Sequence, residues 1–138
     1  MIQVLIFKES RFPADRLKIK TFVENYLEKK VHGAAEVGIN IVGDRKMKSL
    51  NSKYRNLNKT TDVLSFPLAD PHSPQRTELK TGFTSEKSAP DKVLRLGDVV
   101  ISYPQSVLAA AKSDKLVDQK IEELIAHGLD HLLGIHHE

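Results

Sequence analysis

Four histidines lie close together in the last segment of the sequence, HGLDHLLGIHHE. His127 and His131 are separated by one helical turn in a stretch whose apolar residues have helical spacing, so their side chains should share a face, with Cβ atoms about 5–6 Å apart. Two imidazoles at this separation can bind one metal ion. The pair alone is weak evidence, because histidines at this spacing also occur on solvated helix faces.

A third ligand can come from the residues that follow Gly134. In a continuous helix His137 would lie about 15 Å along the axis from His127, which is too far to share an ion. Glycine just past a helix end readily adopts the left-handed conformation that turns the chain back. The spacing of His127, His131, Gly134 and His137 is then that of the zinc ligands in metzincin proteases. Three nitrogen ligands with an open fourth position are typical of catalytic zinc. The sequence therefore predicts a zincin-like three-His site for Zn²⁺ at the end of the last helix.

Two neighbours of these histidines limit the chemistry. A zinc protease with this spacing needs a Glu directly after the first histidine as general base, and this sequence has Gly128 there, so peptide hydrolysis is disfavoured. His136 is a candidate proton carrier beside the third ligand, although a solvent-exposed side chain is an equally good interpretation. The chain has no cysteine, so any transition metal must be held by histidines and carboxylates, and no organic cofactor is indicated.

The composition is that of one globular domain over residues 1–138, with 40% hydrophobic and 28% charged residues. The formal net charge of +3 permits a polyanionic partner without requiring one. The apolar run near the N-terminus is interrupted by Lys8 and Glu9, and no stretch approaches membrane-spanning length, so neither a signal peptide nor a membrane partner is expected. The expected location is the cytoplasm.

The hydrophobic periodicity predicts the elements that position these side chains. Strands are predicted at residues 2–6, 36–42, 61–66 and 94–102, and helices at residues 12–30, 45–55, 104–112 and 118–133. A long mobile surface loop is predicted from residue 68 to about residue 95, because periodicity is lost there. This order of elements predicts an α+β domain in which helices pack on a small mixed β-sheet of about four strands.

Individual residues in these elements also carry predictions. Pro13 and Pro104 suit the starts of two helices. Asp44 is a plausible N-cap of the second helix, and Leu17, Phe22 and Leu27 are available for one face of the first. Asp62 can cap the turn or point toward the site, and the structural role is preferred. The roles of Asp98 and Ser102 stay open, since an Asp at a strand start often only satisfies loop amides.

Three segments resemble the YbeY family, the bacterial ribosomal RNA maturation endoribonucleases. HGLDHLLGIHH is similar to the family signature HGxLHLxGYDH, and the segments LNSKYRNLNKTTDVLSFP at residues 50–67 and LGDVVIS at residues 96–102 resemble two further family blocks in the family's order. The resemblance implies a single YbeY-like domain that acts as a metal-dependent, single-strand-specific endoribonuclease in the cytoplasm. The implied roles are maturation of the 3′ end of small-subunit 16S rRNA and ribosome quality control. The implied partners are ribosomal RNA, the small ribosomal subunit and its assembly factors, and neither DNA nor a membrane.

By motif position, the resemblance assigns the zinc ligands to His127, His131 and His137, and the family's functional arginine to Arg55. A guanidinium can hold two phosphate oxygens and stabilise the charge that develops during phosphodiester cleavage. Without the resemblance, an arginine that stabilises a helix end is the preferred interpretation.

Basic residues near Arg55 are candidates for RNA binding, among them Lys53 and Lys59. They can track a phosphate backbone, or they can form the solvated face of a helix.

Three residues depart from the family pattern. Asp130 stands where the family usually has an apolar residue, Ile135 replaces a Tyr, and His136 replaces an Asp. These departures motivate a second hypothesis, a non-catalytic ribosome or rRNA-binding assembly factor with a structural zinc.

Overall fold

The computed structural model describes residues 1–68 and 93–135 of the chain. In this part, strands and helices follow one another in the order β1 (Ile2–Lys8), α1 (Arg16–Glu28), β2 (Ala35–Val42), α2 (Asp44–Arg55), β3 (Val63–Pro67), β4 (Leu94–Ser102), α3 (Tyr103–Ser113) and α4 (Val117–Leu132). The predicted order of elements is therefore confirmed. The loop predicted for residues 68–95 lies mostly outside the described residues, and its last two residues belong to β4.

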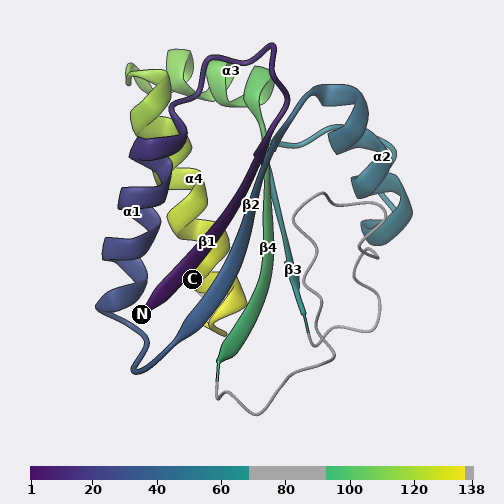
Figure 1. The fold of residues 1–138 in the computed structure, drawn as a ribbon. Coiled ribbons are helices and arrows are strands. Elements are labelled where there is room, and N and C mark those ends of the chain that lie inside the picture. The colour runs from purple at the N-terminus through teal and green to yellow at the C-terminus, as the bar shows by residue number, and fades with distance from the viewer. Residues whose placement is uncertain (69–92, 136–138) are drawn as a thin grey trace.

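The strands form one mixed sheet in the order β1-β2-β4-β3 (Figure 1). β1 pairs with β2, and β2 with β4, in parallel, whereas β3 pairs with β4 in antiparallel orientation. This confirms the predicted α+β class and the four-stranded mixed sheet. β3 is an edge strand, which matters for the site described below.

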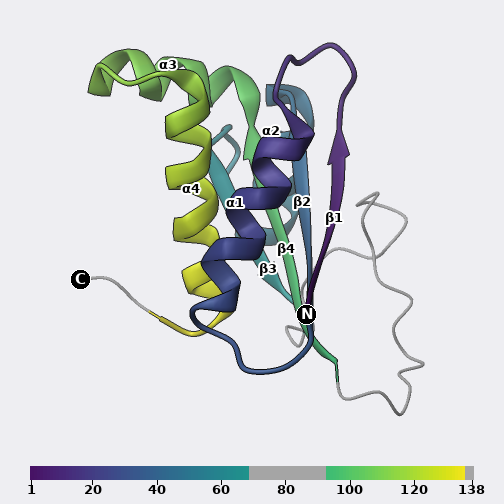
Figure 2. The same ribbon diagram turned by 60° about the vertical axis from the view of Figure 1, so that its left-hand side comes forward.

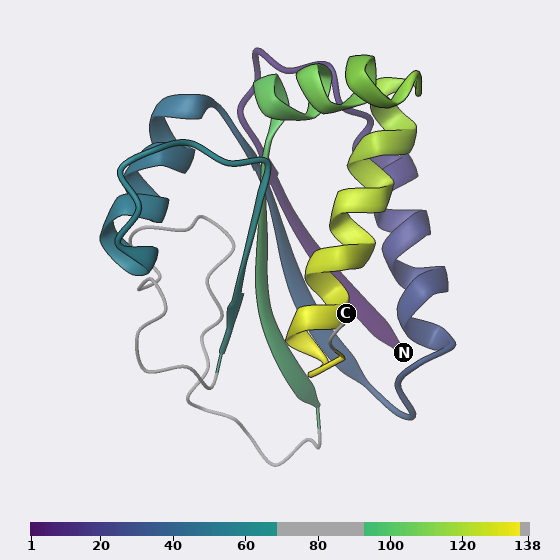
Figure 3. The same cartoon turned by 180° about the vertical axis from the view of Figure 1, so that it is seen from behind.

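Helices cover both faces of the sheet. α1 and α4 lie on one face and α2 on the other, while α3 crosses the end of the sheet at which β4 finishes (Figures 2 and 3). Alternation along β4 explains this arrangement, because successive side chains of a strand point to opposite faces. Val99 and Ile101 belong to the core under α1 and α4, and Val100 belongs to the smaller core under α2.

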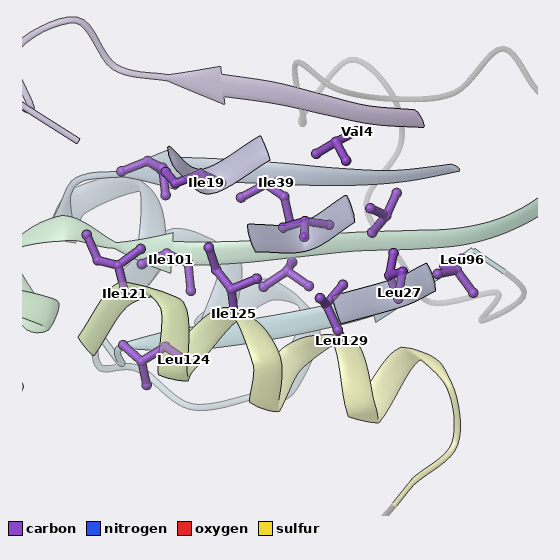
Figure 4. Packing of buried hydrophobic residues seen from close by; sticks show 14 of the residues in the cluster. Val4, Ile19, Leu27, Ile39, Leu96, Ile101, Ile121, Leu124, Ile125 and Leu129 are labelled. Atoms are coloured by element: carbon purple, nitrogen blue, oxygen red, sulfur yellow. The ribbon is translucent and has the colours of Figure 1, made fainter. Parts of the chain in front are cut away.

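The larger core joins α1 and α4 to the sheet, and Figure 4 shows Leu27, Ile39, Ile125 and Leu129 meeting there. All four side chains are fully buried. This packing fixes α4 against β4 and so determines where the helix presents its outer face.

The buried face of α1 differs from the predicted one. Leu27 is buried as expected, but it is accompanied by Ile19 and Val23, and Leu17 is 70% exposed. The helix begins later than predicted, at Arg16, because the Asp15 carboxylate accepts hydrogen bonds from the first-turn amides of Leu17 and Lys18. Leu17 therefore lies in the first turn and points away from the core. Pro13 precedes the helix rather than starting it.

The prediction that Asp44 caps α2 is wrong. Gly43 occupies the cap position, and Asp44 is the first helical residue. Its Oδ1 accepts hydrogen bonds from Thr60 Oγ1 at 3.0 Å and from Ser102 Oγ at 2.9 Å. Ser102 in turn caps α3, because its Oγ accepts a hydrogen bond from the Gln105 amide at 3.2 Å. Asp44 therefore joins the start of α2 to the segment before β3 and to the start of α3.

Gly97 allows β3 to lie close to β4. It has φ +128°, and a Cβ added there would lie 2.2 Å from the carbonyl oxygen of Phe66. Only glycine avoids both the strained backbone and this clash. The position of β3, and of the residues that β3 presents, depends on this residue.

Among residues 1–68 and 93–135, no helix is both long and apolar enough to cross a membrane.

Candidate functional site

The C-terminal end of α4 has the geometry that the sequence predicts for Gly134. This residue has φ +80°, its amide donates to the carbonyl of His131 at 3.1 Å, and the amide of Ile135 donates to the carbonyl of Asp130 at 2.8 Å. These two bonds form a Schellman motif, which ends the helix and redirects the chain. The predicted helix end is confirmed. His136 and His137 follow it but lie outside the described residues.

His127 and His131 lie side by side on the outer face of α4. Their ring centroids are 4.6 Å apart, and both side chains are exposed. Both line a pocket of about 270 Å³, together with Gly128, with Arg55 at the end of α2 and with Val63, Leu64 and Ser65 of β3. The structure thus brings together residues from three distant segments of the chain.

Gly128 explains why the two histidines lie so close to the sheet. A Cβ at this position would lie 2.7 Å from Val99 Cγ1 and 3.0 Å from Val99 Cγ2. The missing side chain therefore lets α4 approach β4 closely. From the sequence alone, Gly128 only argued against a peptidase, and its packing role was missed.

We expect Gly128→Ala to lower the free energy of unfolding by up to about 2 kcal/mol. Overpacking costs about 1–3 kcal/mol, and the higher helix propensity of alanine offsets about 1 kcal/mol of this. In a Val99→Ala background the added methyl has room, so there the same substitution should stabilise the protein. Urea denaturation of the wild type, the two single variants and the double variant measures this change of sign, and an equal loss in both backgrounds would contradict the packing role.

Arg55 is the last residue of α2, and its guanidinium is held against β3. Nη1 donates to the carbonyl of Tyr54 at 3.0 Å, and Nη2 donates to the carbonyl of Ser65 at 2.9 Å. Its Cζ lies 4.7 Å from the centroid of the Phe66 ring. Asn56 ends the helix in the left-handed conformation directly after Arg55. The arginine is thus a fixed cationic group at the pocket and not only a surface charge at a helix end.

Lys53 and Lys59 are not among the residues that line this pocket. Both are exposed, and Lys53 Nζ lies 5.5 Å from the centroid of the Tyr54 ring. The described geometry therefore gives neither lysine a place beside the two histidines.

The pocket-lining residues of β3 were not predicted. Val63, Leu64 and Ser65 lie in a segment that resembles the family, and their composition indicates a strand. Local periodicity gives no information on strand order, so it could not place this strand at the edge of the sheet beside α4.

Asp130 faces the interior between α1 and α4 and is 4% exposed. The hydroxyl of Tyr26 donates to its Oδ1 at 2.7 Å. Burial and this hydrogen bond raise the pKa of Tyr26 to about 12. Asp130 is absent from the described lining of the pocket. This buried carboxylate thus connects two helices of the core.

We expect Tyr26→Phe to lower the free energy of unfolding by about 1.5–3 kcal/mol near neutral pH, since it removes a hydrogen bond to a charged group. The raised pKa of Tyr26 means that its contribution is fully present below pH 10 and is lost as the pH rises toward about 12. The stability difference between wild type and Tyr26→Phe should therefore shrink between these two pH values. A difference that stays constant to pH 12 in urea titrations would contradict this assignment.

The complete three-His site lies partly outside the described residues. Within residues 1–68 and 93–135, no group of three or more His, Cys, Asp or Glu side chains is placed to hold a metal ion. His127 and His131 fit two positions of a zinc site, because two exposed imidazoles adjoin each other at a pocket. His137 as the third ligand stays a prediction, as does His136 as a proton carrier.

A comparison with known protein families shows to which family the chain belongs. The family model described as "Endoribonuclease YbeY" matches residues 6–138. The chain belongs to this YbeY family. Among curated relatives named "Endoribonuclease YbeY", that of Dehalococcoides mccartyi is 42% identical over 105 residues, which are 75% of this chain and 59% of the relative. That of Roseiflexus sp. strain RS-1 is 36% identical over 125 residues, which are 90% of this chain and 71% of the relative.

The chain spans 59% to 64% of the length of three Dehalococcoides mccartyi YbeY relatives that it matches. A solution structure of the protein TM1509 from Thermotoga maritima is similar with a TM-score of 0.57 and 21% sequence identity, covering 100% of this chain and 75% of that one. This likeness supports the fold described above.

Proposed function

We propose that this YbeY-family chain is a zinc-dependent endoribonuclease that cleaves single-stranded RNA. Its proposed roles are maturation of the 3′ end of small-subunit 16S rRNA and ribosome quality control in the cytoplasm. The proposed partners are ribosomal RNA, the small ribosomal subunit and its assembly factors. The observation that carries the proposal is that Arg55, His127 and His131 line one pocket.

Zn²⁺ would be held by His127, His131 and His137. When bound, it supplies a Lewis acid that stabilises negative charge on a phosphoryl oxygen. The donor set supports zinc, because imidazole nitrogens suit this metal and the chain has no cysteine that could provide a thiolate.

Arg55 would bind and orient the scissile phosphate. Its hydrogen bonds to the carbonyls of Tyr54 and Ser65 fix the guanidinium before substrate arrives. A guanidinium has five N–H donors in a planar fork, so donors remain for the phosphate oxygens. A donor that is already oriented stabilises the charge developing in the transition state without the cost of reorganisation.

His136 would move a proton at the scissile phosphate, because a histidine titrates near neutral pH and is suited to general acid–base work. Lys53 and Lys59 would contact phosphates outside the pocket. Both are exposed and lie within or shortly after α2, whose last residue is Arg55. Phosphate contacts of this kind make binding depend on salt rather than on sequence.

The proposal is tested by incubating the purified chain with a labelled single-stranded RNA and with the same RNA annealed to its complement. We expect cleavage within the single strand, little cleavage of the duplex, loss of activity with EDTA, and recovery when zinc is added in excess of the chelator. Cleavage that persists after complete removal of the metal would contradict the proposal.

An alternative is a non-catalytic rRNA-binding assembly factor with a structural zinc. The burial of Asp130 against Tyr26 favours it, because this carboxylate does not replace at the pocket the acid that the family usually has before its last ligand. The same assay separates the two functions. Salt-sensitive binding of RNA without turnover, by protein that contains zinc, would support the alternative.

A further inference from the structure

The hydrogen-bond register of β3 determines which of its backbone groups face away from the sheet. The amide of Ser102 donates to the carbonyl of Asp62 at 2.9 Å, and the amide of Leu68 donates to the carbonyl of Leu96 at 3.1 Å. Both bonds join residues that lie directly opposite in the antiparallel register. In such a ladder, hydrogen-bonded pairs alternate with pairs that are not hydrogen-bonded. The even-numbered residues of β3 therefore direct their N–H and C=O groups toward β4.

The odd-numbered residues Val63 and Ser65 direct their N–H and C=O groups to the free edge of β3, the side on which no strand among residues 1–68 and 93–135 pairs with it. An independent contact agrees with this register, because the outward carbonyl of Ser65 accepts the hydrogen bond from Arg55 Nη2. Val63 and Ser65 also line the pocket that contains Arg55 and the two histidines. The free edge of β3 is thus one wall of the candidate site.

This edge is poorly suited to the addition of another β-strand. The carbonyl of Ser65 already accepts a hydrogen bond from Arg55, and the next outward residue, Pro67, has no N–H to donate to a further strand. Next to the arginine, and within the part of the chain that the structure describes, the edge offers the N–H and C=O of Val63 and the N–H of Ser65. These two donors and one acceptor are too few to pair with an extended peptide, but they suit a small planar ligand.

We propose that the backbone N–H and C=O of Val63 bind the Watson–Crick edge of an unpaired nucleobase next to the phosphate held by Arg55. In an extended residue the two groups point the same way, side by side. Each RNA base has a hydrogen-bond donor beside an acceptor on its Watson–Crick edge, and proteins read these edges on single strands. Val63 and Arg55 line the same pocket, so a base bound at Val63 would lie beside the phosphate that Arg55 holds.

This inference rests on the proposed function and gives it a source of specificity. In a duplex the Watson–Crick edges are already paired, so they cannot reach the edge of β3. Because all four bases present a donor beside an acceptor, the contact selects the unpaired state and not the sequence.

The first test uses RNA chemistry and the unmodified protein. Binding of three short oligonucleotides to the zinc-loaded protein is compared by stopped-flow fluorescence anisotropy, at times before cleavage sets in: oligouridine, the same strand with N3-methyluridine, and the same strand with 5-methyluridine. The N3-methyl group blocks the Watson–Crick edge without adding charge, whereas the 5-methyl group lies away from that edge. We expect binding to weaken about 3- to 10-fold with N3-methyluridine only, as for the loss of one or two hydrogen bonds.

Equal binding of oligouridine and its N3-methyl form would overturn the inference and leave the proposed function standing. No binding of oligouridine would overturn the proposed function and the inference with it.

The second test removes the donor from the protein. Val63→Pro deletes an N–H that faces outward, so the ladder with β4 stays intact, and the chain already has a proline at the equivalent outward position 67. Val63→Ile keeps the N–H and is the matched control. We expect Val63→Pro to have a KM for single-stranded RNA about 3- to 10-fold higher than that of Val63→Ile, with a similar kcat in both variants.

Unchanged KM in a folded Val63→Pro protein would overturn the inference. An extended Thr-Val hexapeptide tests for the addition of a β-strand at the same edge. If Val63→Pro abolished binding of this peptide but left RNA binding unchanged, the inference would also be overturned.

Discussion

Arg55→Ala is expected to slow cleavage of single-stranded RNA by about 10²–10³-fold, the usual effect of removing one preorganised donor from a transition state. The guanidinium is held at the pocket by two backbone carbonyls, of Tyr54 and Ser65, so its position does not depend on the substrate. Single-turnover cleavage with enzyme in excess measures the chemical step directly.

Lys53→Ala is the matched control, because Lys53 is a nearby cation on the same helix that does not line the pocket. We expect it to weaken RNA binding a few-fold in a salt-dependent way and to leave the single-turnover rate almost unchanged. Arg55→Lys keeps the charge but not the planar fork, so most of the loss should persist. Equal rates for Arg55→Ala and wild type would contradict the role of this arginine.

His131→Ala is expected to lower metal-dependent cleavage by at least about 10²-fold, because metal ions supply several kcal/mol of charge stabilisation in such reactions. His131 is exposed and adjoins His127 at the pocket, so its loss should not disturb the core. The measurement is the cleavage rate over a zinc titration, in which excess zinc should not restore the variant.

His32→Ala is the control for this prediction. His32 is also exposed, but it lies between α1 and β2 and outside the pocket lining. Its replacement should leave both activity and the zinc response unchanged. A His131→Ala protein that cleaves RNA as wild type does would exclude this histidine as a ligand.

The elements of the fold were predictable where local chemistry marks them. β4 has the predicted bounds of residues 94–102, because it is apolar and Ser102 and Pro104 begin the helix that follows. Leu17 was assigned wrongly because the cap at Asp15, which fixes the start of the helix at Arg16, was not recognised. Asp44 was assigned wrongly because its environment depends on residues far away in the sequence, such as Ser102, and local spacing carries no information on them.

The candidate site was predictable only in part, for the same reason. The His127–His131 pair follows from helical periodicity and so could be predicted from the sequence. Arg55 was assigned through the family resemblance alone, since nothing local distinguishes it from other basic residues of α2. The wall formed by Val63 and Ser65 was missed, because it depends on β3 being the edge strand next to α4.

The most direct test of the zinc site is the metal content of the purified, tag-free chain, measured by inductively coupled plasma mass spectrometry beside His131→Ala and His32→Ala. The three-His site predicts about one zinc per chain in the wild type and in His32→Ala, and almost none in His131→Ala. A wild-type chain without zinc after exposure to the metal, or a His131→Ala chain that retains it, would contradict the account.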